Sequence, residues 1–592
     1  MFQIKWLWHN LKGCRRLYVI GMCLTVVCQS MFLVYPFINQ RVVDTFIINP
    51  NALQNVQVNR DLLIQLCLGL VLFTLARVCL QYATGLIYEK SSQHMIYKIR
   101  SRLYESIQYQ DMRFYDRNRT GDLMTRLSGD VDMVRHAVAW IIRTLLEALS
   151  LFTISVIYFF VLDPLMALSL LALTPLIFGI VMAFRKKIGP MYVELREKLS
   201  QMNTGAQENI SGNRVVKAFA REDFEIQKFE ERNQEFSAAN KTAALTWLDY
   251  FPYLEITCQA LGVIMLLLGG IFVINGRMTA GEFIAFNGMI WTISNPMRMF
   301  GNLINDFQRF MASAAKIIEI YYARPTIVNR ADAVEHPERF KGDIEFKNVS
   351  FKYDNATVLK DISFTVKAGE TVAIMGETGS GKTTLVNMIP RFYDTASGEV
   401  RIDGINVRML KLDQLRKNIG MATQDVLLFS DTIDGNVAFG NSGMPEESVR
   451  HYAKLAAADE FIGKMPEGYE TIIGERGVGL SGGQKQRISL ARALAIRPSV
   501  LILDDTTSAV DLETEKYIQE SLATLDFTCT KIIIAQRISS TKNADKIIIL
   551  KDGEISEIGT HNELLRLGGY YSEVFDLQNE GFEKAGDVYG QK

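Results

Sequence analysis

A glycine-rich stretch that ends in Lys382 and Thr383 carries the clearest chemistry in the chain. It reads GETGSGKT from Gly376, follows the apolar run TVAIM and precedes the helical run TTLVNMI. Glycines at this spacing let backbone N–H groups converge on phosphate oxygens at a helix N-terminus. The lysine can reach the terminal phosphates of a nucleotide, and the threonine hydroxyl can bind Mg²⁺. The flanking strand and helix disfavour the alternative of a purely structural turn.

The sequence therefore predicts a nucleoside triphosphate site, with ATP-binding positions at Gly376, Glu377, Thr378, Gly379, Ser380, Gly381, Lys382, Thr383 and Thr384. A second acidic group follows in the run VLILDD, where four apolar residues end in Asp504. An aspartate directly after a buried strand is the expected second partner of the Mg²⁺ ion. Together the two motifs indicate a P-loop NTPase.

A third motif identifies the branch of these enzymes. Leu480, Ser481, Gly482, Gly483 and Gln484 spell LSGGQ shortly before the VLILDD strand, and here the sequence resembles the ATP-binding cassette (ABC) family. The resemblance extends over nearly the full chain. It implies an adenine-stacking aromatic at Tyr353, a Q-loop glutamine at Gln424 that also serves the Mg²⁺ ion, a Glu475-Arg476-Gly477 motif before LSGGQ, and a D-loop with Ser508 and Asp511.

The resemblance also covers the first half of the chain. The segments FYDRNRTGDLMTRLSGDVDMVR (114–135) and SGNRVVKAFARED (211–223) are similar to the intracellular loops of ABC exporters, whose coupling helices dock on the nucleotide domains. Phe114, Tyr115 and Phe219 are the candidate anchors. Ordinary helix packing is the alternative reading of each aromatic.

Two residues depart from the family pattern at the catalytic position. Asp505 stands where the family usually has a glutamate that activates water, and Gln536 stands where it has a histidine. A displacement of about 1 Å can reduce the rate about 10²-fold, and glutamine cannot carry a proton as imidazole can. We therefore expect a degenerate site that hydrolyses ATP slowly, as in heterodimeric bacterial multidrug ABC exporters.

The LSGGQ motif predicts that the chain acts as a dimer. Its serine and glycines precede a helix and offer a second anion-binding helix start, which closes on the γ-phosphate held by the other subunit. The chain carries one cassette and half the membrane helices that an alternating-access exporter requires. The expected partner is a second, different half-transporter, whose catalytic site this chain's LSGGQ completes.

The membrane-spanning part is predicted from apolar runs of about 20 residues, the length that crosses a bilayer core. Six such runs lie near 17–39, 62–88, 139–161, 164–184, 251–275 and 281–303. The charged segments 89–138 and 185–250 show helical spacing and are expected to extend the spans as cytoplasmic stalks; a soluble domain in each loop is the alternative. The predicted fold is a membrane α-helical bundle plus an α/β P-loop domain.

Charge and composition predict which segments of the chain are cytoplasmic and where its domains begin and end. Lys and Arg gather at the N-terminus and in the two long loops, which predicts that these segments are cytoplasmic and that the protein is multi-pass in the cell membrane. The predicted parts are a transmembrane domain (1–323), a linker (324–342) and a nucleotide-binding domain (343–592). The net charge of −1 gives no reason to expect a nucleic-acid partner, and the seven cysteines show no disulfide framework.

Polar residues inside the predicted spans are candidates for the substrate path, because ionisable groups in membrane helices usually face a cavity or a partner. They are Arg77, Arg143, Glu147 and Glu255, with Gln81, Gln259, Asn287, Trp291 and Asn295 as weaker candidates. The i,i+4 pair Arg143 and Glu147 can also satisfy each other.

The leading functional hypothesis is an ATP-driven exporter of hydrophobic or amphipathic compounds, with drugs, lipids and peptides as candidate substrates and ATP and Mg²⁺ as cofactors. An importer of metal chelates with the same fold is one alternative. The other is a mainly regulatory, nucleotide-sensing subunit. The substrate itself is not encoded in any motif.

Overall fold

The computed structural model describes residues 2–47, 56–336, 339–354, 356–474, 477 and 479–589, except that side chains at 56–59, 297–298, 300–302 and 580–589 are left out. Glu475 and Arg476, two residues of the predicted motif before LSGGQ, lie outside this set. The described chain divides into two compact units. One comprises residues 1–109 and 119–323, and the other comprises residues 110–118 and 324–592.

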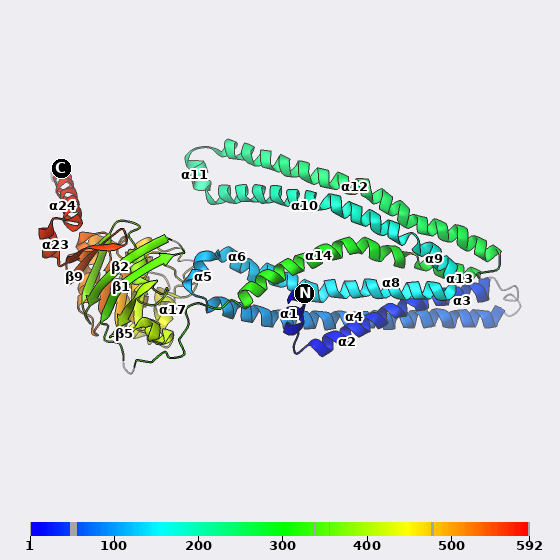
Figure 1. Ribbon diagram of the computed structural model, residues 1–592, viewed down its shortest axis with the longest axis horizontal. Helices are drawn as coiled ribbons and strands as arrows, with labels where there is room; N and C mark the ends of the chain where they lie inside the picture. The colour runs from blue at the N-terminus through cyan, green and yellow to red at the C-terminus, as the bar shows by residue number, and fades with distance from the viewer. Residues whose placement is uncertain are drawn as a thin grey trace. The chain divides into compact units, whose positions relative to one another are not determined.

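Long helices make up the first unit (Figure 1). The N-terminal part forms α1 (Phe2–Asn10), α2 (Arg15–Ser30) and α3 (Val34–Val42). Then come α4 (Val56–Gln108), α6 (Thr120–Thr125), α7 (Val131–His136), α8 (Ile142–Leu162), α9 (Pro164–Leu171), α10 (Thr174–Ser211), α11 (Asn213–Ala218), α12 (Glu222–Ile274), α13 (Ala280–Met289) and α14 (Trp291–Tyr321). Helices α10 and α12 pack along each other and are joined by the short α11, as Figure 1 shows.

Five helical segments of the described chain are long and apolar enough to cross a membrane: Arg15–Ile47, Arg60–Gln108, Thr120–Leu162, Pro164–Ser211 and Glu222–Ile274. The expected helical stalks are confirmed, because α4 and α12 each run for 53 residues through both apolar and charged sequence. Such a helix is about 80 Å long, far more than the bilayer core needs.

The predicted sixth span, 281–303, is not a single helix. It is divided between α13 and α14, with an interruption at Ile290. Pro296 follows inside α14, and its backbone nitrogen has no hydrogen to donate to the preceding turn. The helical hydrogen bonding of this stretch is therefore weakened at two points, although Ile290 keeps helical dihedrals (φ −53°, ψ −39°) and α14 continues through Pro296.

Two β-sheets form the core of the second unit. The first has the order β2-β1-β4-β5 and consists of β1 (Ile344–Tyr353), β2 (Ala356–Val366), β4 (Ser397–Ile402) and β5 (Ile405–Asn406). The second has the order β10-β9-β3-β8-β7-β6 and consists of β3 (Thr371–Gly376), β6 (Ile419–Ala422), β7 (Val500–Asp504), β8 (Thr530–Ile534), β9 (Lys546–Lys551) and β10 (Glu554–Gly559). Buried Val, Ile, Leu and Phe side chains of both sheets pack into one core.

Helices accompany these sheets. They are α15 (Lys382–Val386), α16 (Leu412–Lys417), α17 (Ile433–Val437), α18 (Glu446–Leu455), α19 (Asp459–Gly463), α20 (Gly482–Ala495), α21 (Leu512–Ala523), α22 (Ile538–Thr541), α23 (His561–Leu567) and α24 (Tyr570–Tyr589). The short α5 (Met112–Arg117), although far away in sequence, belongs to this unit too. In the larger sheet β3, β8, β7 and β6 are parallel, so their carboxyl ends meet at one edge. Ligands bind at this edge in open α/β sheets.

A loop contact between the spans of the first unit generates a stability prediction. The Asp163 carboxylate accepts a hydrogen bond from the Met166 backbone N–H (2.8 Å), which caps α9, and pairs with the Arg277 Nε (2.7 Å). The Asp163→Ala variant loses both interactions and should lower the free energy of unfolding by about 1–3 kcal/mol, since Arg277 is half exposed. Asp163→Asn keeps the cap, so its free energy of unfolding should fall by less. Thermal unfolding in detergent measures both variants, and an equal fall in the two would contradict this account.

Candidate functional site

The loop between β3 and α15 is held open by glycines whose backbone no other residue adopts easily. Gly376 has φ +144°, and a Cβ there would lie 2.1 Å from the carbonyl oxygen of Leu550. Gly381 has φ +99°, and its Cβ would lie 2.9 Å from a methyl group of Leu359. The glycines thus let the backbone turn tightly between the strand and the helix and leave the concave side of the loop free.

That concave side opens into a cavity of about 230 Å³. The cavity brings together most of the positions predicted from the nucleotide motifs: Thr378, Gly379, Gly381, Lys382, Thr383, Thr384, Gln424, Asp504, Asp505 and Gln536. The remaining walls are apolar and come from Val358 and Ile534. Tyr353 is not part of this wall; it lies at the end of β1, edge-on to the ring of Tyr393 (5.3 Å).

Charged groups in the cavity are already arranged around the loop. The Lys382 Nζ donates to the backbone carbonyls of Gly376 (2.9 Å) and Glu377 (2.7 Å), and the Thr383 hydroxyl donates to Asp504 Oδ2 (2.8 Å). Burial lowers the pKa of Lys382 and raises the pKa of Asp504, in the second case against the hydrogen bond from Thr383. A ligand of opposite sign would favour the charged form of each group and so counter the effect of burial.

These residues fit a nucleotide phosphate with a divalent cation. The hydroxyl of Ser380 is buried and has no hydrogen-bond partner among the described residues, so it has a free donor within the loop. A backbone without Cβ atoms, a buried lysine and a threonine–aspartate pair supply the donors and acceptors that ATP and Mg²⁺ require. In the part of the chain that is described, no cluster of His, Cys, Asp and Glu forms a separate metal site.

The two residues that depart from the family pattern both lie in this cavity. Asp505 has φ +51°, its N–H donates to Ile534 O (3.0 Å), and its carbonyl accepts from the Ser508 hydroxyl (3.0 Å). Burial raises the pKa of the Asp505 carboxyl. Gln536 is exposed and lines the same cavity, just beyond β8. Neighbouring residues therefore fix the backbone of Asp505. A shift of the backbone cannot carry its short side chain further into the cavity.

The LSGGQ segment lies outside this cavity and begins α20. Ser481 caps the helix by accepting from the Gln484 N–H (3.3 Å), while the Gln484 side chain accepts from the Ser481 N–H (2.9 Å). Ser481 and Gly482 are exposed. Leu480 lies partly buried against the core of this helical region, and Gly483 packs on the backbone of Ala509. The start of α20 is thus an exposed helix N-terminus fixed by its own capping box.

The D-loop connects this helix to the cavity. Asp511 caps α21 by accepting from the Thr514 N–H (2.9 Å), which lowers the pKa of its carboxyl. Gln486 on α20 is buried and donates to the carbonyl of Asp505 (3.3 Å) and to the hydroxyl of Ser508 (3.2 Å). Its own oxygen accepts from the Ala509 N–H (3.2 Å). One amide therefore joins the LSGGQ helix, the D-loop and the end of β7.

A second amide, which sequence reasoning missed, fixes the loop that carries Gln536. Gln578 on α24 donates to the Gln536 carbonyl (2.9 Å) and accepts from the Ile538 N–H (2.9 Å). Arg537 between them donates to the Ser508 carbonyl (3.2 Å). The C-terminal helix, the Gln536 loop and the D-loop therefore form one hydrogen-bonded network. No sequence motif marks Gln578, because its role depends only on tertiary contact.

Helix α5 contacts the rest of the second unit through residues that were not predicted from the sequence. The Tyr393 hydroxyl donates to Asp116 (2.9 Å), Arg117 pairs with Asp354 (2.5 Å), and the Thr326 N–H donates to Asp111 (2.6 Å). The predicted anchors Phe114 and Tyr115 contact each other edge-on (5.5 Å). Phe219, beyond α11, is 73% exposed in the first unit. Polar side chains therefore join α5 to the rest of the unit. One of them, Tyr393, contacts Tyr353, the residue predicted to stack on adenine.

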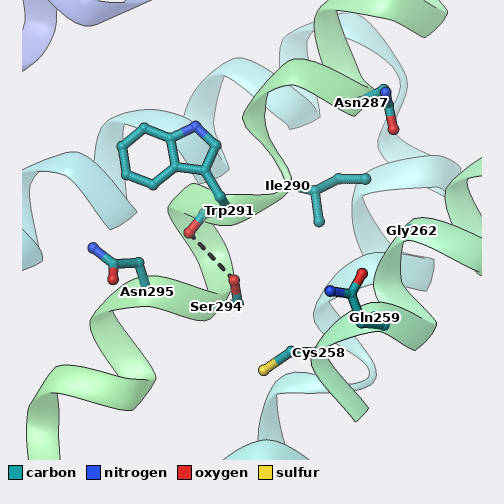
Figure 2. Close-up of a pocket in the computed structure, with 8 residues that line it drawn as sticks. All are labelled: Cys258, Gln259, Gly262, Asn287, Ile290, Trp291, Ser294 and Asn295. Carbon is teal, nitrogen blue, oxygen red and sulfur yellow. Dashed lines mark hydrogen bonds between the residues drawn. The ribbon is translucent and has the colours of Figure 1, made fainter. Parts of the chain in front are cut away.

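Most of the predicted substrate-path residues line two cavities in the first unit, whereas Arg143 and Glu255 line neither. One, of about 390 Å³, is bounded by α12, α13 and α14 and includes Asn287, Trp291, Asn295 and Gln259 (Figure 2). The other, of about 240 Å³, includes Arg77, Gln81, Glu147 and again Trp291 and Asn295.

The ionisable candidates differ in their surroundings. Arg143 pairs with Glu147 (2.8 Å), as their spacing allows. Glu255 lines neither cavity but accepts from the Gln259 amide (3.0 Å). Arg77 lies over the ring of Phe32 (5.1 Å).

Comparison with known proteins decides the family. The model of the ABC transporter transmembrane region matches residues 18–297, and the ABC transporter model of the nucleotide domain matches residues 359–508. The ABC transporter ATP-binding protein YknU of Bacillus subtilis (strain 168) is 36% identical over 570 residues, which cover 95% of each chain. The chain belongs to the ABC transporter family.

Two further similarities describe this ABC transporter. An ATP-dependent lipid A-core flippase of Syntrophus aciditrophicus (strain SB) is 36% identical over 92% of the chain and 91% of its own length. The structure of a bacterial Atm1-family ABC exporter with ATP bound superposes with a TM-score of 0.80 at 24% identity, covering 95% of this chain and 99% of that one. The ABC transporter is therefore a multi-pass membrane protein with the exporter fold and an ATPase domain, and its family uses ATP with Mg²⁺.

The contact between α5 and Tyr393 generates a prediction about coupling. Tyr393→Phe keeps the ring against Tyr353 but removes the hydroxyl that donates to Asp116, so the ABC transporter should bind ATP normally and transport less per ATP hydrolysed. A hydrogen bond to a charged group contributes about 1.5–3 kcal/mol, so its loss corresponds to about a tenfold effect or more. Transport and hydrolysis are measured together in proteoliposomes. The matched control is Tyr469→Phe, which removes an equivalent bond to Asp459 (2.7 Å); equal effects of both variants would contradict the prediction.

The Gln578 contacts generate a second prediction. Gln578→Met keeps the side-chain volume and removes both hydrogen bonds, so the Gln536 loop should loosen and the affinity of this chain for a fluorescent ATP analogue should fall about three- to tenfold. Gln578→Glu keeps only the hydrogen bond from the Ile538 N–H, so its affinity for the ATP analogue should lie between those of the unmodified chain and Gln578→Met. Gln414→Met is the control, because Gln414 makes the same pair of backbone bonds to His336 away from the cavity. Unchanged affinity in Gln578→Met would refute the role.

Proposed function

We propose that this chain is one half of a heterodimeric ABC exporter that works by alternating access and moves hydrophobic or amphipathic compounds out of the cytoplasm. Asp505 and Gln536 carry the proposal, because both line the ATP cavity where the family usually has a glutamate and a histidine. Lys382, Thr383, Gln424 and Asp504, which are expected to hold ATP and Mg²⁺, line the same cavity. The site therefore retains what binding requires and lacks the groups that activate water.

The physical argument concerns reach and proton transfer. An aspartate is one methylene shorter than a glutamate, and Asp505 has its backbone fixed by the bonds to Ile534 and Ser508. About 1 Å of misplacement can reduce a rate about 10²-fold. Gln536 can hydrogen-bond a phosphate but cannot act as an acid or base. This chain's own phosphate-loop site, with Lys382, Thr383 and Asp504, holds ATP and hydrolyses it slowly.

The partner contributes what this site lacks. The exposed, capped start of α20 presents Ser481 and two glycine N–H groups, a suitable anion site for the γ-phosphate bound by a second cassette. Hydrolysis mainly takes place in that composite site, with this chain's LSGGQ and the partner's catalytic residues. A partner of different sequence explains how an active pump contains Asp505 and Gln536.

Orientation and coupling follow from the charged segments. Lys and Arg gather at the N-terminus and in the stalks, so these parts and the nucleotide-binding domain lie in the cytoplasm. Helix α5 transmits nucleotide binding through Asp116 and Arg117, and the exposed Phe219 anchors the other coupling helix on a nucleotide domain. The flippase relative named above supports a lipid-like or otherwise amphipathic substrate.

Restoring the family residues tests the proposal. In the co-purified pair, the double variant Asp505→Glu with Gln536→His should raise ATP turnover several-fold, because the second site then gains a water-activating carboxylate and an imidazole. Asp526→Glu, an exposed aspartate paired with Arg497, is the matched control for the added methylene.

An active homodimer of this chain would contradict the proposal. If the chain purified alone forms a homodimer whose ATP hydrolysis is fast and coupled to transport, the heterodimer and the slow site are both wrong. Mass spectrometry of the native complex identifies the subunits, and turnover is measured on the same sample.

A further inference from the structure

Glu515 on α21 is a buried charged residue that none of the nucleotide motifs includes. Its side chain is 2% exposed, and a carboxylate removed from water needs a counter-charge or several hydrogen bonds. The hydroxyls of Thr507 (3.3 Å) and Ser540 donate to its Oε1, and the Gln519 amide makes a longer contact with the same oxygen (3.5 Å). Its Oε2 is buried without a hydrogen bond among the described residues. That oxygen therefore depends on a nearby positive charge.

Arg537 supplies this charge. Its Nη1 lies 3.6 Å from Glu515 Oε2, and its Nη2 donates to the backbone carbonyl of Ser508 (3.2 Å). Arg537 is 44% exposed, so it could point into water at little cost, whereas Glu515 would then be left buried and unpaired. The buried carboxylate thus enforces the contact. It fixes Arg537 between α21 and the D-loop.

The position of Arg537 matters because it directly follows Gln536, which lines the ATP cavity. The Gln536 side chain is exposed, so the backbone of its loop, rather than packing, sets the direction of its amide. Gln578 holds that backbone by donating to the Gln536 carbonyl (2.9 Å), and Glu515 holds it from the next residue through Arg537. A glutamine amide can donate a hydrogen bond to a phosphate oxygen.

We infer that Glu515 is a positioning residue, which acts through Arg537 to direct the Gln536 amide toward the terminal phosphate of ATP bound at this chain's own site. The inference rests on the proposed function, in which that site holds ATP, and adds the means by which it distinguishes ATP from ADP. The glycine-rich loop also meets the phosphates that both nucleotides share, whereas a group that reaches only the terminal phosphate favours ATP. A carboxylate that only stabilised the domain would affect both nucleotides equally.

Photolabelling of the co-purified pair tests the inference. An azido group on the adenine labels the chain that holds the nucleotide, so 8-azido-ATP and 8-azido-ADP report on this chain's site once the two subunits are separated on a gel. Glu515→Gln keeps the shape of the side chain and removes its charge. The concentration of 8-azido-ATP for half-maximal labelling should rise about three- to tenfold, as for the loss of one hydrogen bond, and that of 8-azido-ADP should not change.

Variants of the loop show whether Glu515 acts through Gln536. Arg537→Met changes a partly exposed side chain, leaves the buried one intact and should cause the same ATP-selective loss. In a Gln536→Ala background, Glu515→Gln should cause no further loss, because the two residues then act as one unit. Glu399→Gln is the matched control, since Glu399 on β4 also pairs with an arginine, Arg401, but lines no part of the ATP cavity.

Four outcomes would overturn the inference. These are an equal loss of affinity for both nucleotides, an unchanged affinity for 8-azido-ATP, an additive loss in the Glu515→Gln and Gln536→Ala double variant, or the same loss in Glu399→Gln. In each case, labelling of the unmodified chain by 8-azido-ATP leaves the proposed function standing. An unmodified chain that takes up no 8-azido-ATP would instead contradict the proposed function, and the inference with it.

Discussion

The parallel pairing of β3, β8 and β7 is the constraint on which the nucleotide site depends. Ile534 at the end of β8 pairs with Ile374 on one side and with Asp504 on the other. The three strands therefore end almost level, and the chain leaves them as the phosphate loop, the Gln536 loop and the Asp505 turn. All polar groups of the cavity project from an edge whose alignment is fixed by apolar side chains in the sheet core.

The sequence predicted the parts of this site that chemistry requires at fixed spacing. Lys382 and Thr383 could be found because a phosphate loop tolerates few residue types, and Asp504 because it ends an apolar strand. The long helices were predictable from apolar length and helical spacing, and the stalks of α4 and α12 are confirmed. The break at Ile290 was not predicted, because hydropathy measures apolar length and is insensitive to a single interrupted turn.

Most of the site contacts that could not be predicted from the sequence are tertiary contacts. Gln578 lies about 40 residues beyond Gln536, and Tyr393 lies far from Asp116, so no local pattern connects either pair. The aromatics Phe114 and Tyr115 were the predicted anchors in α5, yet Asp116 accepts a hydrogen bond from Tyr393, the capping residue Asp111 accepts one from Thr326, and Arg117 pairs with Asp354. Polar side chains of this kind are common on surfaces, and only the fold shows which of them meet.

Helix α4 has no internal proline, whereas the other helices of more than 30 residues, α10, α12 and α14, contain Pro190, Pro252 and Pro296. A continuous 53-residue helix resists bending, so it behaves as a stiff lever rather than a hinge. With a length of about 80 Å, a tilt of about 5° displaces one end by about 7 Å relative to the other. Small angular changes at one end are thereby amplified, while the proline-containing helices can absorb the accompanying strain.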